Sequence, residues 1–532
     1  MTSFGWADRI AAATVKSTPR QVGAVPVVYP LLEELRVRET INALRQTGAD
    51  IDLGRLVEVL TLNRLMAPQP IYRVGKWATQ TVVVSMFGLA PQKLYDQRFG
   101  RGLDDLHSIL GEAWVRLAAR AVQQEGIDLS VIHWDTTSIY LEGEYEDSEL
   151  AAYGHSSDGR SDAKQVKVGL DVTSRERMPL LYRLLNGAIA DITTPVPNQR
   201  AIAAFLRRPE CEGMAVRPLV VGDCKMITPA AVAAAHEHNL YYLGPWESSN
   251  AVRTAIGGVS NAELAASELS YRPKRHFSAD RPFVPYRGVW RPFPVTYDGK
   301  TYHDRALVVW SVGKQRLDEQ KRKHYLKKLL NRLDEIHRHL NRGRYIKHEY
   351  AAHQIGLAQR GNPAKGLVTV ELTGEDRHLE LSFRIDRDAL AQAQALDGKY
   401  LLGTNASHLS ASEALTWFKA QDGVEKRNGD LKGPLRVRPL YLQSDQRIEG
   451  LVFINLLALL VRALLELRCR RAGLNYTAGR VLRAFEPLYA TDQVFVDGSR
   501  LTQLGEMTPF QQRVLDRLHV PSPTRYLHNL PG

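Results

Sequence analysis

The stretch Ser130–Leu141, SVIHWDTTSIYL, decides the fold class of this chain. Its run of β-branched and aromatic residues is typical of a strand. Strands mixed with helices follow it along the chain, and this mixture predicts an α/β unit. The further strand-like runs are Gln165–Val172, Pro179–Leu185, Arg217–Gly222 and Leu240–Gly244, and a helical pattern covers Pro229–His238.

The segments on either side of this unit have different patterns. Residues 26–125 repeat leucine and isoleucine at helical spacing and predict a helical N-terminal region. Residues 246–395 indicate an insertion of mixed structure. It contains a basic amphipathic helix over Lys314–Lys347, with twelve Lys or Arg against four Asp or Glu, and alternating runs that predict a hairpin, Val368–Leu372 with Leu379–Ile385. We therefore predict five segments: 1–125, 126–245, 246–395, 396–470 and 471–532.

Composition narrows the function classes. A chain of 532 residues is too long for one core and predicts two to four structural units. The net charge of +12 favours a polyanionic partner, with nucleic acid first; a basic enzyme without such a partner is the alternative. The three cysteines form no CxxC pair, so neither a zinc knuckle nor a disulfide framework is indicated. The N-terminus has no apolar core of signal-peptide length, and Leu451–Leu465 is interpreted as a buried helix too short to span a bilayer.

Two aspartates lie in or directly after predicted strands, at positions where α/β sheets can carry active-site residues. Asp135 lies inside the apolar strand run, where an acid is costly unless it is paired or bound to a cation. Asp223 follows the apolar run of Pro218–Val221, and active-site groups of α/β sheets sit at strand ends. The alternatives are an edge-strand aspartate facing water and an ordinary turn aspartate.

A third acid is Glu425, in Val424–Lys432, VEKRNGDLK. Glu425 and Lys432 are seven residues apart, so on a helix they share one face at a separation of about 10 Å, and Phe418 and Gln421 are predicted on the same face. A solvated helix face is the alternative. Three clustered carboxylates repel one another and need cations, and oxygen ligands select Mg²⁺ or Mn²⁺. Glu449 is a rival third acid that lacks a lysine seven residues on.

Together these residues resemble the DDE transposases of bacterial insertion sequences, in the branch with a Tyr-x2-Arg-x3-Glu-x6-Lys signature. The resemblance covers about residues 26–470. It departs from the signature at Phe418, in the tyrosine position, and at Gln421, in the arginine position. The motifs that carry it are His133–Tyr140, Val220–Lys225, Glu425 with Lys432, Gly154–Gln165, Asp397-Gly398 before Thr404-Asn405, Arg438–Tyr441, Leu62–Leu65 and Gly100–Asp104.

The resemblance implies an RNase H-like catalytic core, split by a mixed β/α insertion and preceded by a helical N-terminal DNA-binding domain. It implies that Asp135, Asp223 and Glu425 bind the metal, expected to be two Mg²⁺ ions with Mn²⁺ as a substitute. The implied reaction is cutting of transposon ends and joining to target DNA. The candidate DNA contacts are Lys432, Gln421, Phe418, Arg160, Lys164 and Arg427.

The expected partners are double-stranded DNA, as terminal inverted repeats and as target, and a second copy of the chain on that DNA. No membrane is expected, and the expected location is the cytoplasm, with the nucleoid. Two rival functions stay open: a catalytically inert DNA-binding protein descended from a transposase, and a metal-dependent nuclease without strand transfer. Trp246 and Trp290, in or beside the insertion, are either ordinary core residues or holders of a flipped base.

Overall fold

The computed structural model of the chain describes residues 14–156, 159–211, 217–273 and 283–527. The first 13 residues, and Ser157 and Asp158 of the Gly154–Gln165 motif, lie outside the described residues. The chain forms two compact units. The first comprises Met1–Gly222, Glu237–Leu240 and Lys419–Gly532, and the second comprises Asp223–His236 and Tyr241–Phe418. The predicted boundaries after residues 125 and 470 therefore fall inside the first unit.

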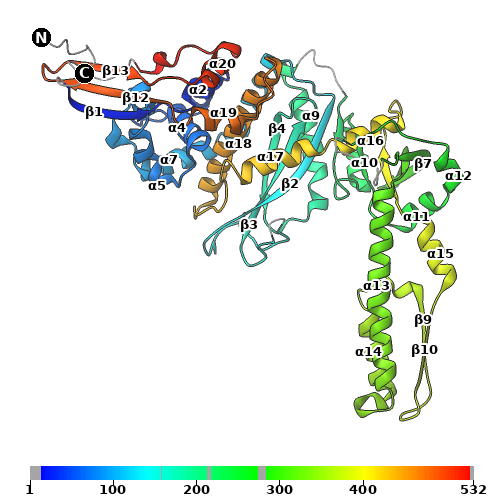
Figure 1. Cartoon of the computed structure of the whole chain (residues 1–532). Coiled ribbons are helices and arrows are strands. Elements are labelled where there is room, and N and C mark those ends of the chain that lie inside the picture. Colours follow the sequence, from blue (N-terminus) through cyan, green and yellow to red (C-terminus); the bar gives the residue numbers. More distant parts are fainter. Residues whose placement is uncertain (1–13, 157–158, 212–216, 274–282, 528–532) are drawn as a thin grey trace, which may run out of the picture. The chain divides into compact units, whose positions relative to one another are not determined.

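A mixed sheet forms the centre of the first unit (Figure 1). Its strand order is β4-β3-β2-β5, in which β2, β3 and β4 are antiparallel neighbours and β5 runs parallel to β2. The helix α9 (Pro195–Leu206) lies in the connection between β4 and β5. This arrangement confirms the predicted α/β class. The strands are β2 (Val131–Tyr140), β3 (Gln165–Thr173), β4 (Pro179–Asn186) and β5 (Leu219–Val221).

The helix α18 (Asp445–Arg471) is the axis on which the rest of the first unit packs. It contacts α2, α4, α7, α8 and α17 as well as β4. By length and composition it could cross a membrane, but 94% of its most apolar window is buried inside the protein. The predicted buried helix is confirmed, whereas the length expected from Leu451–Leu465 was too short. The N-terminal helices are α2 (Val25–Glu34), α3 (Val37–Leu44), α4 (Leu53–Met66), α5 (Ile71–Thr79), α6 (Val83–Met86), α7 (Asp96–His107) and α8 (Leu110–Glu125).

Strand register assigns each helix to a face of the sheet. Asp135 is paired with Leu170, and Leu170 with Tyr182, so these three side chains share one face. The rings of Trp114 in α8 and Phe453 in α18 form an edge-to-face cluster with this face: Trp114 lies 5.0 Å from Tyr182 and 6.2 Å from Phe453. The helices α8 and α18 therefore cover the face that carries Asp135.

The opposite face carries a buried acid. Asp171 is paired with Trp134, the neighbour of Asp135 on β2, and so points to the other side of the sheet. There its Oδ1 accepts a hydrogen bond from Nδ2 of Asn198 in α9 at 2.9 Å. Trp134 lies over Gly169, where a Cβ atom would come within 2.0 Å of the indole ring. A glycine is thus required beside this tryptophan.

We expect the stability of the first unit to fall as the pH rises from about 4 to about 8. Burial raises the pKa of Asp171 from 3.8 to about 8, so its stabilising contribution is complete while the carboxyl is protonated and is lost on ionisation. Asp171→Asn should remove this slope and be more stable than the wild type at pH ~8, by a few kcal/mol. Thermal melts at a series of pH values test this, and an unchanged slope in Asp171→Asn would contradict it.

The two ends of the described chain pair with each other. The strand β1 (Thr14–Gln21) is antiparallel to β12 (Tyr489–Phe495), which also pairs with β13 (Arg500–Leu504). Two further helices, α19 (Ala478–Phe485) and α20 (Pro509–Arg517), belong to the same C-terminal segment. No sequence motif marked this small sheet, because it is built from segments more than 450 residues apart.

The second unit contains four neighbouring antiparallel strands, in the order β6-β11-β8-β7. Pro292 and Pro294 occur in β7, which is the edge strand, and an edge strand tolerates residues without an N–H donor. Because of these prolines, the sequence pattern did not predict β7 as a strand. The strands are β6 (Tyr241–Pro245), β7 (Arg287–Tyr297), β8 (Lys300–Trp310) and β11 (Lys399–Thr404); the helices beside them are α10 (Pro229–Glu237), α11 (Asn250–Gly257), α12 (Asn261–Ala265), α15 (Arg387–Ala395) and α16 (Ala411–Lys419).

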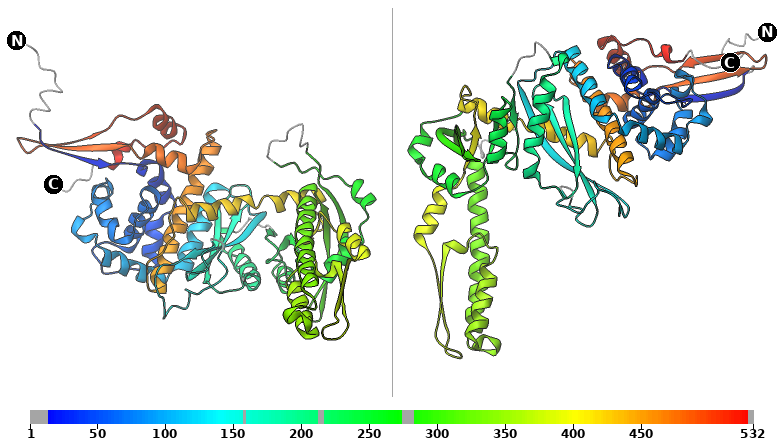
Figure 2. Two further views of the ribbon diagram at one scale, coloured as in Figure 1. Left: turned by 60° about the horizontal axis from the view of Figure 1, so that its bottom comes forward. Right: turned by 180° about the vertical axis from the view of Figure 1, so that it is seen from behind.

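A long arm extends from these four strands of the second unit (Figures 1 and 2). It consists of α13 (Val312–His339), α14 (His348–Gln359) and the hairpin of β9 (Val368–Thr373) with β10 (Glu380–Ile385). The arm has its own small apolar core. The predicted hairpin is confirmed, whereas the basic helix ends at His339, before the predicted Lys347. The buried core residues are Leu329, Leu333, Ile336, Ile355, Val368 and Leu381.

Candidate functional site

The candidate site of the first unit lies where α17 (Asp422–Lys432) packs on β2 and β3. Asp135 is half-buried in the middle of β2, and its Oδ2 accepts a hydrogen bond from Nδ2 of Asn428 at 2.9 Å. Glu425 is exposed and precedes Asn428 by three residues, so both lie on one face of α17. The structure thus brings the strand acid against the helix that carries Glu425.

Sequence analysis overlooked Asn428. Its side chain is buried, and its Oδ1 has no hydrogen-bond partner among the described residues. The spacing of three residues from Glu425 was a usable signal, since residues three apart on a helix are neighbours. A buried amide that donates to a half-buried acid restrains the position of both.

The predicted continuous face from Phe418 to Lys432 is not formed. Phe418 belongs to α16, which ends at Lys419, and Gln421 is the N-cap residue of α17. The ring of Phe418 lies 6.2 Å from that of Tyr400 within the second unit. Because the helix is interrupted between Lys419 and Asp422, the seven-residue spacing does not align Phe418 with Glu425. Lys432, half-buried at the end of α17, retains its place on the helix.

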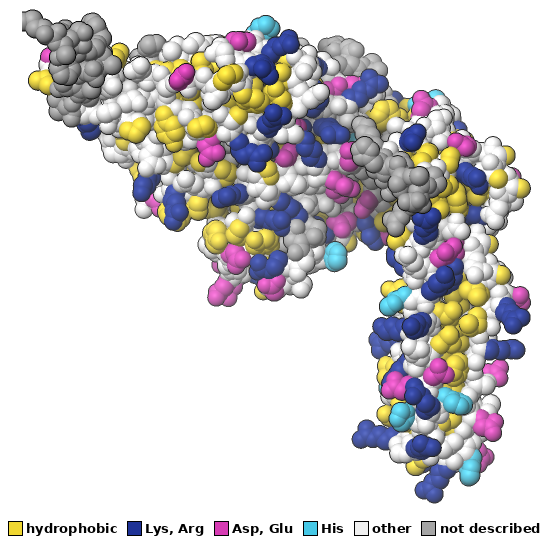
Figure 3. Space-filling view, viewed as in Figure 1, with side chains coloured by type: hydrophobic (Ala, Val, Ile, Leu, Met, Phe, Trp, Pro, Cys, Tyr) yellow, Lys and Arg dark blue, Asp and Glu magenta, His cyan; other side chains and the backbone are white. Residues whose placement is uncertain are grey.

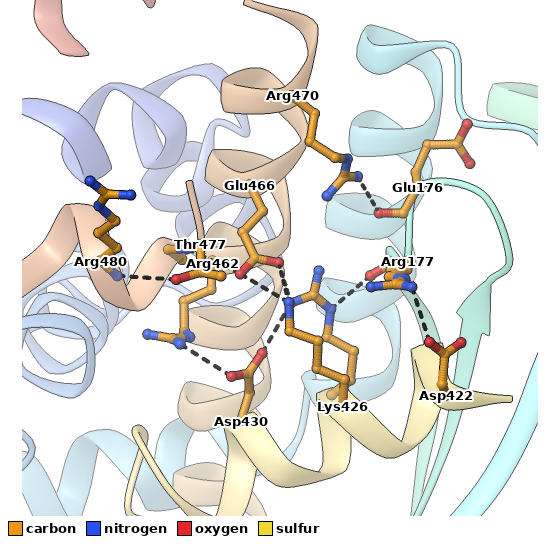
Figure 4. Close-up of polar contacts among 12 residues, drawn as sticks. Glu176, Arg177, Asp422, Lys426, Asp430, Arg462, Glu466, Arg470, Thr477 and Arg480 are labelled. Atoms are coloured by element: carbon orange, nitrogen blue, oxygen red, sulfur yellow. Dashed lines mark hydrogen bonds and ion pairs between the residues drawn. The ribbon is translucent and has the colours of Figure 1, made fainter. Parts of the chain in front are cut away.

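A buried charge network fixes α17 to α18 (Figure 4). Arg427 has no exposed surface, and its guanidinium pairs at 3.1 Å with both Asp430 and Glu466. Its Nε also donates to the carbonyl oxygen of Arg177 at 2.8 Å. A side chain without exposed surface does not reach DNA, so Arg427 acts here in packing and not as the expected DNA contact.

Further pairs complete this network. Arg462 of α18 lies 3.2 Å from Asp430, and Lys426 lies 3.3 Å from Glu466. Burial pushes the pKa of Glu466 upward, but the charges of Arg427 and Lys426 and the N–H group of Ala478 hold the pKa below its usual value. Glu466 is therefore ionised, as the pairing requires.

His133, two residues before Asp135 on β2, adds no positive charge to the site. Its side chain is 1% exposed, and burial lowers its pKa to about 4. The Nε2 atom lies 3.1 Å from the hydroxyl of Ser174. The imidazole is neutral near pH 7, so it does not neutralise the Asp135 carboxylate.

Asp223 lies on an exposed turn, two residues after β5. Its Oδ1 accepts the backbone N–H of Lys225 at 2.9 Å, and its carbonyl oxygen accepts that of Met226. It is counted in the second unit, whereas Asp135 and Glu425 belong to the first. The strand end predicted for Asp223 is confirmed.

Two of the predicted DNA contacts lie beside the end of β2. The guanidinium of Arg160 stacks over the ring of Tyr140 at 4.9 Å and pairs with Asp162 at 2.8 Å. Lys164 donates from Nζ to the carbonyl oxygen of Tyr145 at 2.8 Å. Arg160 keeps 38% of its side chain exposed, so it presents a cation at the surface.

The rival residues are engaged elsewhere. Glu449 forms a 2.7 Å contact with Nδ1 of His107 in α7. Trp246 is partly buried against the core of the second unit, and Trp290 is covered by the guanidinium of Arg305 at 3.9 Å from its ring. Trp246 thus packs as a core residue, whereas Trp290 is half-buried on the edge strand β7.

The donor atoms at the Asp135 face are those that Mg²⁺ prefers. Carboxylate oxygens of Asp135 and Glu425 and the amide oxygen of Asn428 are all hard oxygen donors. Among the residues that the structure describes, no three His, Cys, Asp or Glu side chains are grouped closely enough to hold a metal ion. These residues therefore match Mg²⁺ in the chemistry of their oxygen donors and not in a formed cluster of ligands.

Comparisons with solved structures include a match to a chain bound to DNA. It is the piggyBac transposase in a synaptic complex with hairpin DNA, determined by cryo-EM. The two chains are 8% identical, the match covers 88% of this chain and 82% of that one, and the TM-score is 0.39. No protein-family model matches this chain, and neither does the sequence of any curated protein. The assignment of a function therefore rests on the residues of the site.

Proposed function

We propose that this chain is a DNA transposase of the DDE type with an RNase H-like core. The contact between Asp135 and Asn428 is the observation that carries the proposal, because it sets the strand acid against the helix that bears Glu425. The third carboxylate, of Asp223, follows β5 in the chain, and Val221 of β5 is paired with His133 of β2. Each aspartate thus comes two residues after a member of this pair, Asp135 within β2 and Asp223 after the end of β5, where active-site acids of α/β sheets occur.

In the proposed mechanism Asp135, Asp223 and Glu425 would hold the metal. A bound Mg²⁺ supplies activation of a water or a 3′-hydroxyl and stabilises the leaving oxygen of a phosphodiester. Asn428 fixes the rotamer of Asp135 by donating to Oδ2. Lys432 contacts a DNA phosphate as a point charge. Water first hydrolyses the phosphodiester at the transposon end to a 3′-hydroxyl and a 5′-phosphate, and this 3′-hydroxyl then attacks a phosphodiester of target DNA and displaces the target strand's own 3′-hydroxyl.

The deciding experiment uses the full chain and DNA that carries the terminal inverted repeats of its element. With Mg²⁺ or Mn²⁺, cutting followed by joining to a target plasmid would support the transposase. Cutting without joining would identify a nuclease. Specific binding without cutting would identify an inert DNA-binding descendant of a transposase. Two observations favour this second function: the departures from the signature at Phe418 and Gln421, and the helix break beside them. We propose a homodimer on DNA and a nucleoid location as the setting.

We expect cations on the arm to contribute to DNA affinity. Figure 3 shows Lys and Arg side chains along the arm, and Lys321 and Lys328, seven residues apart on α13, are exposed and share a face. The double variant Lys321→Gln/Lys328→Gln should make the slope of log affinity against log salt less steep by about 2, since each phosphate contact contributes about 0.9. Titration of DNA binding at several salt concentrations measures this.

A matched control removes two arm cations that acids already neutralise. Lys314 pairs with Asp318 at 2.8 Å, and Lys347 with Asp376 at 2.7 Å. Lys314→Gln/Lys347→Gln should leave the salt slope nearly unchanged. Equal slopes in the wild type and the Lys321/Lys328 variant would rule out this face of the arm as a DNA contact.

A further inference from the structure

A cavity of about 640 Å³ in the first unit has no part in the proposed chemistry. One wall is formed by Pro68–Tyr72, the loop after α4 with the first two residues of α5, and the other by Arg436–Leu442, in the connection between α17 and α18. Four arginines line the cavity, whereas Asp96 is the one acid among its lining residues. The arginines are Arg64, Arg436, Arg438 and Arg447.

Arg64 is the unusual member of this set. Its side chain lies in α4 and is 5% exposed. Within the described part of the chain no acid pairs with it; its Nη2 donates to Oδ1 of Asn63 at 2.9 Å and to the carbonyl oxygen of Gln69, and its Nε has no partner. Burial alone lowers its pKa to about 10, so it stays charged at pH 7. A buried cation without a counter-ion, at a cavity wall, fits an anionic ligand.

Two exposed aromatic rings belong to the same lining. Tyr72 is 63% exposed and Tyr441 is 62% exposed, which is uncommon for large apolar side chains and suits stacking with an unpaired base. Tyrosine faces stack with bases of any sequence, and arginines neutralise the phosphates between them. A duplex presents its bases already stacked and paired, so an unpaired nucleotide is the form that these groups fit.

The cavity adjoins the strand that carries Asp135. Leu440, in one cavity wall, forms a parallel bridge with Leu141 just after β2, and the N–H of Glu142 donates to its carbonyl oxygen at 2.9 Å. Arg438 lies over the ring of Tyr140, 5.6 Å from its centroid, and Arg160 lies over the same ring. The wall also continues directly from the end of α17. A DNA strand bound in the cavity would thus lie next to the end of β2.

We propose that this cavity binds an unpaired nucleotide of a DNA strand, with its phosphate at Arg64 and its base against Tyr72 or Tyr441. The inference rests on the proposed function for its DNA, but it concerns binding and not catalysis. Arg436 and Arg438 supply further charge along the same wall. The site selects single-stranded ends or flaps over blunt duplex.

The test is a binding measurement without cutting. The full chain carrying Asp135→Asn is titrated, in EDTA, into a fluorescent duplex with a short single-stranded tail and into a blunt duplex of the same sequence. We expect the tailed DNA to bind about tenfold more tightly, the effect of one stacked base. Tyr72→Ala/Tyr441→Ala should abolish that preference and leave the affinity for blunt duplex unchanged. Tyr153→Ala, which removes another exposed tyrosine outside the cavity lining, is the control.

The phosphate at Arg64 is tested separately. Methylphosphonate linkages in the tail remove its charge and should weaken wild-type binding several-fold, but should not weaken further the binding of Arg64→Met. If Arg64→Met has a much lower melting temperature than the wild type, the effect of methylphosphonate linkages on wild-type binding alone tests the phosphate contact. Equal affinity for tailed and blunt DNA, or a preference that survives the double tyrosine change, would overturn this inference alone. Failure to bind either DNA would overturn the proposed function as well.

Discussion

Asp135→Asn and Glu425→Gln should each lower the rate of DNA cleavage by about 10³-fold, because a metal ion contributes several kcal/mol of transition-state stabilisation. DNA affinity should change little, since it depends on surface cations. The same loss is expected of Asp223→Asn. Cleavage of end DNA by the purified variants, measured in single-turnover reactions, gives the rates.

Matched variants sharpen this result. Glu449→Gln is the control, because Glu449 pairs with His107 and not with the α17 face. Asn428→Ala should have an intermediate effect of about 10- to 100-fold, as expected for a residue that orients a metal ligand. If Glu425→Gln stays active and Glu449→Gln does not, Glu449 is the third acid and the site proposed here is wrong.

Arg427→Met is expected to destabilise the first unit by about 3 kcal/mol, the typical cost of leaving a buried charge without its partner. Glu466 is 3% exposed, and Lys426, at 3.3 Å, would be its remaining cationic partner beside the backbone N–H of Ala478. The loss should appear as a lower melting temperature in circular dichroism and, because α17 carries Glu425, as slower cleavage.

An exposed ion pair of the same helix provides the control for Arg427. Asp422 pairs with Arg177 at 3.3 Å and has 70% of its side chain exposed, so Asp422→Ala should cost less than about 1 kcal/mol. The double variant Arg427→Met/Glu466→Gln should recover part of the loss, since neither charge then remains unpaired. Equal melting temperatures for the wild type and Arg427→Met would show that the network does not hold α17.

Local patterns identified most elements of the α/β unit. The strand-like run at Ser130–Leu141 became β2, and the apolar runs after it became β3, β4 and β5. The stretch Ser410–Glu413, SASE, has the sequence pattern of a capping box, and it starts α16 through reciprocal hydrogen bonds of 2.9 Å and 3.2 Å. These elements were predictable because side-chain period and capping chemistry are properties of neighbouring residues. The edge strand β7 was missed because its prolines are tolerated only where no neighbour requires their N–H.

The sequence by itself determined the acids, the basic charge and the helix that carries Glu425. Tertiary structure alone decided which residues of that helix face inward. Arg427 was an expected DNA contact and became the buried partner of Asp430 and Glu466, whereas Asn428 became the partner of Asp135. The physical reason is that the contacts of Arg427 with Glu466 and of Asn428 with Asp135 join residues 39 and 293 positions apart, and burial of a charge is tolerated only where the folded chain supplies its counter-charge.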